Sequence, residues 1–176
     1  NISCIKVGML YDKSIMNVVK KFLKSLSKIP VIIDPVMISK SGDYLLKPDS
    51  IDFFKKNILP ESFLITPNIH EAMEITGMTK IKTKTDIEDC FKKFNSLGAS
   101  NVLLKGGHFR SEKKSIDYLN FNNKIYTISG VRYATKNTHG TGCTLSAAIS
   151  GNIALGMSLL DATKEAKKFI NNAIKK

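Results

Sequence analysis

Thr-His-Gly-Thr-Gly-Cys-Thr-Leu-Ser-Ala-Ala, residues 138–148, is the stretch from which the rest of the chain is best interpreted. Gly140 and Gly142 flank Thr141 directly before a run of small and apolar residues that is typical of a buried helix. Glycines permit a tight turn in which several backbone N–H groups converge, and the helix start adds the positive end of its dipole. The stretch therefore predicts a site for an anion.

This glycine-rich turn differs from two widespread phosphate loops. It lacks the Gly-Lys-Ser/Thr ending of a Walker A loop and the third glycine of a dinucleotide-binding fingerprint. An anion hole of this kind suits a phosphoryl group in transfer, where catalysis depends mostly on positioning and electrostatics. The alternative is a turn that merely begins a helix, and the residues alone leave both interpretations open.

Cys143 follows the second glycine, in the first turn of the predicted helix. A thiolate is stabilised at a helix N-terminus, so we expect its pKa to lie below the value of about 8.5 for a free cysteine. Cys143 is then a candidate for taking a proton from a substrate hydroxyl. The alternative is a small residue packed between the helix and a sheet.

The rest of the chain alternates strand-like runs with helical patterns, which predicts an α/β fold with a mainly parallel sheet. The predicted strands are residues 4–7, 31–34, 63–66 and 102–105, followed by an antiparallel hairpin of residues 116–121 and 124–128. The predicted helices include residues 85–97, 143–155 and 159–174. We expect Thr85 and Glu88 to cap the first of these helices and Gly98 to end it.

Polar residues end or directly follow several of these strands, at the sheet edge where ligands of parallel α/β sheets bind. They are Asp34, Thr66, Asn68 and Lys105. An unpaired charge is costly at the end of an apolar strand, so Lys105 is expected to contact phosphate. Asn68 and Glu71 also have the spacing of a helix cap, so their role stays open between ligand binding and capping.

Composition narrows the classes of protein further. The 176 residues are 43% hydrophobic and 24% charged, which is typical of a folded domain with its own core. No apolar run has the length of a transmembrane helix, and no signal-peptide pattern is found. Cys4, Cys90 and Cys143 are too widely spaced to form a metal-binding pair, so we expect a reduced, cytoplasmic protein without membrane association.

The net charge of +12 is a feature that nucleic-acid-binding proteins share. The basic residues are almost all lysines, however, and they are spread along the chain rather than gathered in an arginine-rich stripe with aromatic residues between. We therefore expect no specific nucleic-acid binding. A positive field would instead raise the rate of encounter with phosphate-bearing substrates.

Taken together, these segments resemble the hydroxymethylpyrimidine/phosphomethylpyrimidine kinases of thiamine biosynthesis, a family of the ribokinase-like superfamily. Residues 138–148 resemble the family's signature, which has cysteine at position 143 where most of the superfamily has aspartate. The resemblance extends in order through residues 6–10, 34–37, 40–43, 65–68, 104–108 and 165–167. It covers nearly the whole chain.

The resemblance implies a ribokinase-like three-layer α/β/α sandwich and the roles of individual residues. Gly140, Thr141 and Gly142 would form the anion hole, and Cys143 would be the base that activates the acceptor oxygen. The residues that would contact ATP are Lys105, Lys167, Thr66 and Asn68. Asn68 and Glu71 match an Asn-x-x-Glu element that holds Mg²⁺ and its waters, and Asp34 would help to organise the region of magnesium and phosphate.

Relatives in this family carry an additional amino-terminal part that supplies strands and much of the pyrimidine pocket. We therefore expect residues 1–176 to form a single but incomplete kinase domain, truncated at the N-terminus. The resemblance implies a homodimeric kinase, at full length, for a small pyrimidine alcohol and its phosphate. A pyridoxal kinase of the same superfamily is the nearest alternative, and a non-catalytic module that keeps the fold is another.

Overall fold

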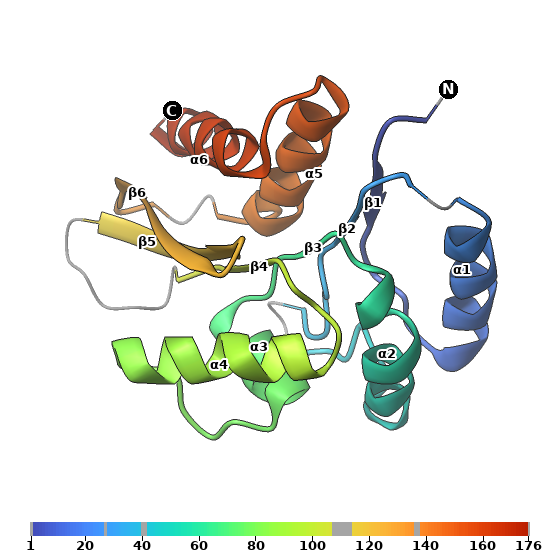
Figure 1. The fold of residues 1–176 in the computed structure, drawn as a ribbon. Coiled ribbons are helices and arrows are strands. Elements are labelled where there is room, and N and C mark those ends of the chain that lie inside the picture. The colour runs from blue at the N-terminus through green and yellow to red at the C-terminus, as the bar shows by residue number, and fades with distance from the viewer. Residues whose placement is uncertain (1, 27, 40–41, 107–113, 136–137, 176) are drawn as a thin grey trace.

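The computed structural model describes residues 2–26, 28–39, 42–106, 114–135 and 138–175. Within these ranges the strands form one mixed sheet in the spatial order β1-β2-β3-β4-β5-β6 (Figure 1). The strands are β1 Ile5–Val7, β2 Val31–Ile33, β3 Leu64–Ile65, β4 Val102–Leu104, β5 Lys114–Phe121 and β6 Lys124–Val131. The first four are parallel and the last two form an antiparallel hairpin, as the sequence predicts.

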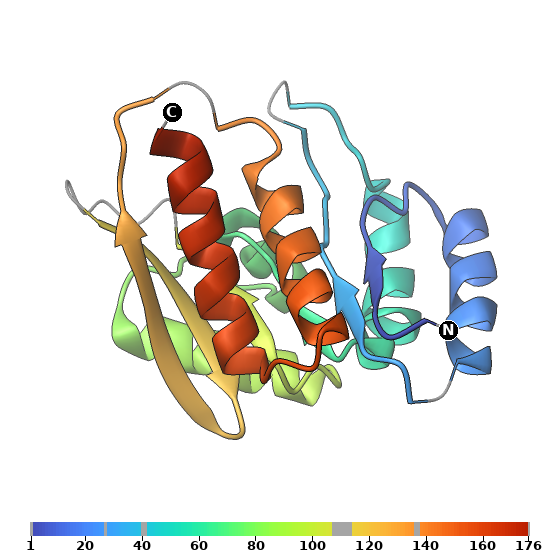
Figure 2. The ribbon, with the colours of Figure 1, turned by 90° about the horizontal axis from the view of Figure 1, so that it is seen from above.

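Helices cover both faces of this sheet and make the predicted three-layer sandwich (Figures 1 and 2). Each parallel strand lies beside the previous one in the same direction, so right-handed crossovers bring the connecting helices to one face. These helices are α1 Lys13–Ser25, α2 Ile51–Asn57, α3 Ile69–Thr76 and α4 Lys84–Ser96, with short 3₁₀ turns at Pro48–Ser50 and Leu59–Glu61. The other face is covered by α5 Thr141–Ala154 and α6 Leu159–Lys175, which follow the hairpin.

Alternation along the strands builds a separate core on each face, because successive strand residues point to opposite sides. In β2, Val31 and Ile33 pack in the cluster under α1 to α4, whereas Ile32 packs in the cluster under α5 and α6. Burial on both sides explains why the parallel strands are continuous apolar runs. In the described part of the chain, no helix is long and apolar enough to cross a membrane.

The predicted N-cap of α4 is wrong by two residues, and the helix begins one residue earlier than predicted. Thr83, not Thr85, is the N-cap: its Oγ1 accepts the Asp86 N–H at 3.1 Å, and Asp86 Oδ2 accepts the Thr83 N–H at 2.9 Å. Thr83 with Asp86 has the same spacing as Thr85 with Glu88. The earlier pair forms the cap, and Asp86 stabilises it further by accepting the Lys82 N–H at 2.9 Å. Gly98 ends the helix region with φ +92°, as predicted.

Candidate active site

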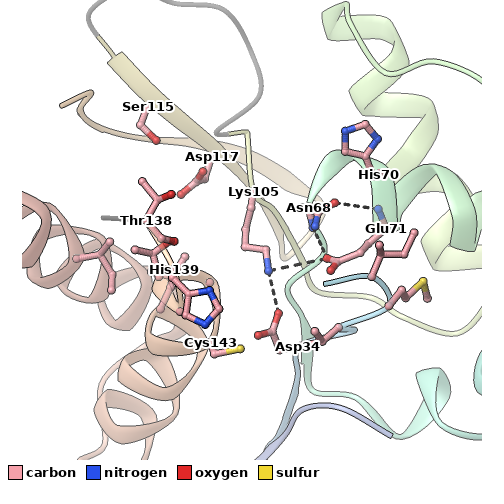
Figure 3. A pocket seen from close by; sticks show the side chains of 18 of the residues that line it. Asp34, Asn68, His70, Glu71, Lys105, Ser115, Asp117, Thr138, His139 and Cys143 are labelled. Atoms are coloured by element: carbon pink, nitrogen blue, oxygen red, sulfur yellow. Dashed lines mark hydrogen bonds and ion pairs between the residues drawn. The ribbon is translucent and has the colours of Figure 1, made fainter. Parts of the chain in front are cut away.

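The strand ends predicted to hold ligands line one cleft of about 1340 Å³ between the helical layers (Figure 3). Asp34 follows β2, Asn68 follows β3, and Lys105 follows β4, so the parallel strands bring them to the same edge of the sheet. The start of α5 closes the cleft from the other face. Of the predicted site residues, Thr66 alone does not line it.

The glycine-rich turn has the geometry of an anion hole. Gly140 is the residue before α5 and has φ +74°, a left-handed conformation that glycine adopts without strain. No side chain caps the helix, and the first helical hydrogen bond runs from the Thr144 N–H to the Gly140 carbonyl at 2.9 Å. The N–H groups of Thr141, Gly142 and Cys143 therefore lie outside the helical ladder, at the positive end of a 14-residue helix.

Lys105 lies at the centre of the cleft. Its Nζ is 2.8 Å from Asp34 Oδ1 and 3.9 Å from Glu71 Oε2, and its side chain is 15% exposed. The same ammonium faces the anion hole, because a methyl group added at Gly142 would lie 3.4 Å from it. A positive charge is thus fixed beside a set of backbone donors, which is an arrangement for binding phosphate.

Asp34 is buried beneath this ammonium and held by hydroxyl groups. Thr66 Oγ1 donates to Asp34 Oδ1 at 3.3 Å, and Ser146 Oγ donates to Oδ2 at 3.3 Å. Burial by itself would raise the pKa of the Asp34 carboxyl, but the charge and hydrogen bond of Lys105 outweigh it, so the pKa lies below 3.8. Asp34 is therefore a carboxylate at neutral pH. Thr66 supports Asp34 from behind, and its nearness to a nucleotide stays a prediction.

Asn68 and Glu71 cap α3 reciprocally. The Glu71 N–H donates to Asn68 Oδ1 at 2.9 Å, and the Asn68 N–H donates to Glu71 Oε2 at 2.7 Å. Glu71 is buried, and this burial raises its pKa from 4.5 to about 7 even though Lys105 lies 3.9 Å away. At that distance the ion pair does not offset the loss of hydration. The capping interpretation is confirmed, and the role of this pair at a metal stays a prediction.

The predicted low pKa of Cys143 is wrong. Partial desolvation of the sulfur in an otherwise exposed residue, the nearby charge of Asp34 and a hydrogen bond to its carboxylate all raise the pKa of the Cys143 thiol from 9.0. The helix start favours a thiolate, but a fixed carboxylate beside the sulfur disfavours it. Cys143 is therefore a thiol, hydrogen-bonded to Asp34.

Lys167 lies in the same cleft but is buried against Asp117, which the sequence interpretation missed. The two form an ion pair with Nζ–Oδ2 of 2.6 Å, and Nζ also donates to Ser115 Oγ at 3.0 Å. A signal for Asp117 does exist in the sequence. Asp117 and Leu119 are two residues apart in a strand, so their side chains point to the same face of the sheet. Leu119 packs under α5 and α6, and a buried charge on that face needs a partner.

Oxygen ligands for Mg²⁺ are present at one place in the cleft. Asp34 and Glu71 both lie against Lys105, whereas no group of three His, Cys, Asp or Glu side chains is arranged for a metal within the described ranges. Mg²⁺ bound with a nucleotide needs only one or two protein carboxylates, because phosphates and waters complete its shell. The two carboxylates fit a metal of that kind.

Some of the sequence segments lie partly outside the described residues. These are the segments 40–43 and 104–108, of which residues 40–41 and 107–108 are not described.

The sheet order, the two helical layers and a glycine-rich turn at the start of α5 together define a ribokinase-like α/β sandwich. The family model described as phosphomethylpyrimidine kinase matches residues 1–176. The chain belongs to this family, which confirms the resemblance found in the sequence.

Individual relatives agree with this assignment. The chain is 40% identical to the hydroxymethylpyrimidine/phosphomethylpyrimidine kinase of Staphylococcus aureus (strain MSSA476) over 171 residues, which are 97% of this chain and 62% of that protein. Among solved structures, it is similar to phosphomethylpyrimidine kinase from Clostridium difficile 630, with a TM-score of 0.80, 37% identity and coverage of 98% and 69% of the two chains. An ADP complex of Bacillus subtilis pyridoxal kinase has a TM-score of 0.89, 34% identity and coverage of 99% and 66%.

Proposed function

We propose that the protein is an ATP-dependent kinase that phosphorylates hydroxymethylpyrimidine and its monophosphate. Because the chain spans 62% of the length of the Staphylococcus aureus relative, this activity is proposed for the protein at its full natural length. The observation that carries the proposal is the Lys105 ammonium facing the free N–H groups of α5 at Gly142. Family membership supports the substrate class.

Phosphate binding follows from this geometry. The N–H groups of Thr141, Gly142 and Cys143 would donate to the transferred phosphoryl group, and Lys105 would neutralise its charge from the opposite side. Both are held before substrate arrives, Lys105 by Asp34 and the turn by α5. Fixed donors aimed at developing charge supply most of the catalysis in phosphoryl transfer.

Cys143 and Asp34 offer a route for the proton of the acceptor hydroxyl. The hydroxyl oxygen attacks the γ-phosphorus of ATP, and the new P–O bond forms as the bond between that phosphorus and the oxygen of the departing ADP breaks. The hydroxyl proton passes to Cys143 Sγ, and the Cys143 S–H proton passes to the Asp34 carboxylate. One O–H and one S–H bond break while one S–H and one O–H bond form, so the relay needs no thiolate beforehand. The relay starts from a thiol and a carboxylate, which are the protonation states that the raised pKa of Cys143 and the lowered pKa of Asp34 give.

Mg²⁺ would be held by Asp34 and Glu71, directly or through waters that Asn68 helps to place. Bound there with ATP, it would neutralise phosphate charge. Asp34 and Glu71 both contact Lys105, so these residues would hold the metal beside the ammonium and the anion hole.

Pyridoxal kinase is a second candidate, and one observation favours it. The fold similarity to Bacillus subtilis pyridoxal kinase has the higher TM-score, 0.89 against 0.80, although the identity is lower. The cytoplasmic location and the homodimer stay predictions.

Turnover by the full-length protein tests the proposal. Release of ADP would be measured with MgATP and each of three acceptors: hydroxymethylpyrimidine, its monophosphate and pyridoxal. We expect the two pyrimidines to give the highest kcat/KM, and Cys143→Ala to lower kcat by about 10²-fold or more. Cys143→Asp should retain more activity than Cys143→Ala, and Cys143→Ser should be poor. A preference for pyridoxal favours the second candidate, and no turnover of any acceptor contradicts a kinase function.

A further inference from the structure

Asp117 is a buried carboxylate that the proposed chemistry does not use. It lies in β5, is 3% exposed, and reaches the cleft beside Ser115 (Figure 3). Each of its oxygens has a different partner: Oδ2 accepts from Lys167 Nζ at 2.6 Å, and Oδ1 accepts from the Gly106 N–H at 3.0 Å. One side chain thus joins α6, β5 and the residue after Lys105.

A carboxylate is needed at this position for a simple reason. Lys167 and the Gly106 N–H are both hydrogen-bond donors, so both sides of the residue must be acceptors. Asparagine has the same shape but only one acceptor oxygen, and its NH₂ group would face a donor on one side. An unmatched buried donor costs far more than a hydrogen bond contributes.

Lys167 depends on Asp117 for its place. A lysine side chain is a flexible four-carbon chain with a point charge and has no rigid shape of its own. On α6 this charge is 7% exposed and lies against Asp117 and Ser115, whereas the neighbouring Lys168 is exposed and pairs with Glu165 at 3.7 Å. The burial of Lys167 and its position in the cleft are therefore set by β5.

We propose that Asp117 is a positioning residue for the nucleotide, which holds the Lys167 ammonium at the cleft wall and fixes the Gly106 backbone next to Lys105. This assignment rests on the proposed kinase function. Asp117 does not touch phosphate, which its charge would repel. One oxygen of Asp117 holds the Lys167 ammonium, and the other holds the backbone of Gly106, the residue after Lys105.

The test is a double-mutant cycle in the full-length protein. Asp117→Asn, Lys167→Met and the double variant would be compared for the KM of ATP, kcat and the Kd of MgADP. We expect each single variant to raise KM and Kd by about tenfold with kcat within about twofold, and the double variant to be no worse than Lys167→Met. Glu165→Gln on the same helix also removes a carboxylate beside a lysine, and it should change nothing.

Three outcomes decide between the roles. Unchanged KM and Kd in a folded Asp117→Asn variant, with only a lower Tm, would mean that Asp117 is structural and would overturn the assignment. Effects of the two single variants that multiply in the double variant would also overturn it, since Asp117 would then not act through Lys167. If wild-type protein binds no MgADP, the proposed function itself fails and this assignment fails with it.

Discussion

The cleft contains two lysine–carboxylate pairs that look alike and are built differently. Lys105–Asp34 spans 2.8 Å and Lys167–Asp117 spans 2.6 Å, and all four side chains are largely buried. Around Lys105 there is a second carboxylate, Glu71, and Asp34 also accepts hydrogen bonds from two hydroxyl groups. Among the described residues, Lys167 pairs with one carboxylate, Asp117, whose other oxygen accepts the Gly106 N–H.

This difference predicts different roles for the two lysine–carboxylate pairs. The Lys105–Asp34 pair belongs to a larger group of titratable side chains beside the anion hole. Lys105 contacts two carboxylates, and one of them, Asp34, is hydrogen-bonded to the Cys143 thiol. The Lys167–Asp117 pair has no net charge, and both oxygens of Asp117 are engaged. The contacts of the pair join α6 to the β5–β6 hairpin. We therefore expect changes in the first pair to affect the rate of transfer and changes in the second to affect nucleotide binding.

The largest expected effect is that of Lys105→Met. It removes the charge facing the transferred phosphoryl group, so kcat should fall by about 10²–10³-fold. It also leaves the buried carboxylates of Asp34 and Glu71 side by side, which should lower the free energy of unfolding by about 3–5 kcal/mol. Steady-state kinetics and thermal melts measure both. Lys167→Met is the matched control, because it removes the lysine of the other pair. A loss of kcat in Lys167→Met equal to that in Lys105→Met would contradict the different roles of the two pairs.

A smaller effect is expected from the titration of Glu71. Its pKa is raised from 4.5 to about 7, so the folded protein binds a proton that the unfolded chain has lost between these values. Stability from this group is complete below about pH 4.5 and is lost as the pH rises through 7, on the order of 3 kcal/mol. Melts from pH 4.5 to 8 measure this loss.

Two control experiments test whether Glu71 causes this loss of stability with rising pH. Glu71→Gln cannot titrate, so its stability should fall less over the same pH range and exceed that of wild type at pH 8. Added Mg²⁺ should stabilise wild type at pH 8 more than it stabilises Glu71→Gln. Equal pH slopes for the two proteins would contradict the raised pKa, and equal effects of Mg²⁺ would place the metal away from Glu71.

The smallest expected effect comes from Gly142→Ala. The added methyl group lies 3.4 Å from Lys105 Nζ, an ordinary van der Waals contact, so the free energy of unfolding should change by less than about 1 kcal/mol. The methyl group intrudes between the anion hole and Lys105, so the Kd for MgATP should rise a few-fold. Calorimetric titration measures it. Gly151→Ala, in the same helix with nothing within 4 Å, should leave the Kd unchanged.

Sequence alone predicted the parts of the site that depend on local pattern. Asp34 and Lys105 were found because each follows an apolar strand, and parallel strands end at one edge. Asp117 was missed because it lies inside a strand and its partner is 50 residues away. The pKa of Cys143 was predicted with the wrong sign because the helix start is visible in the sequence, whereas the approach of Asp34 is set by packing.

The positions of the elements were predicted more accurately than their ends. Strands were expected one residue too long at Asp34, Thr66 and Lys105. The N–H group of each still donates to the neighbouring segment, but the regular strand ends one residue earlier. The start of α4 was misplaced because two pairs share capping spacing, and only the contacts of Asp86 decide between them.

The central claim is that the phosphates of a nucleotide lie at the start of α5, against Cys143. Alkylation by iodoacetamide, followed by mass spectrometry of each cysteine in the full-length protein, tests it within one molecule. Cys143 is exposed, Cys4 is half-buried and outside the cleft, and burial raises the pKa of Cys90 to about 12, so Cys90 should not react. MgATP without acceptor, at ten times its Kd, should slow alkylation of Cys143 by about tenfold and leave Cys4 unchanged. Alkylation of Cys143 at the same rate with bound MgATP would contradict the account.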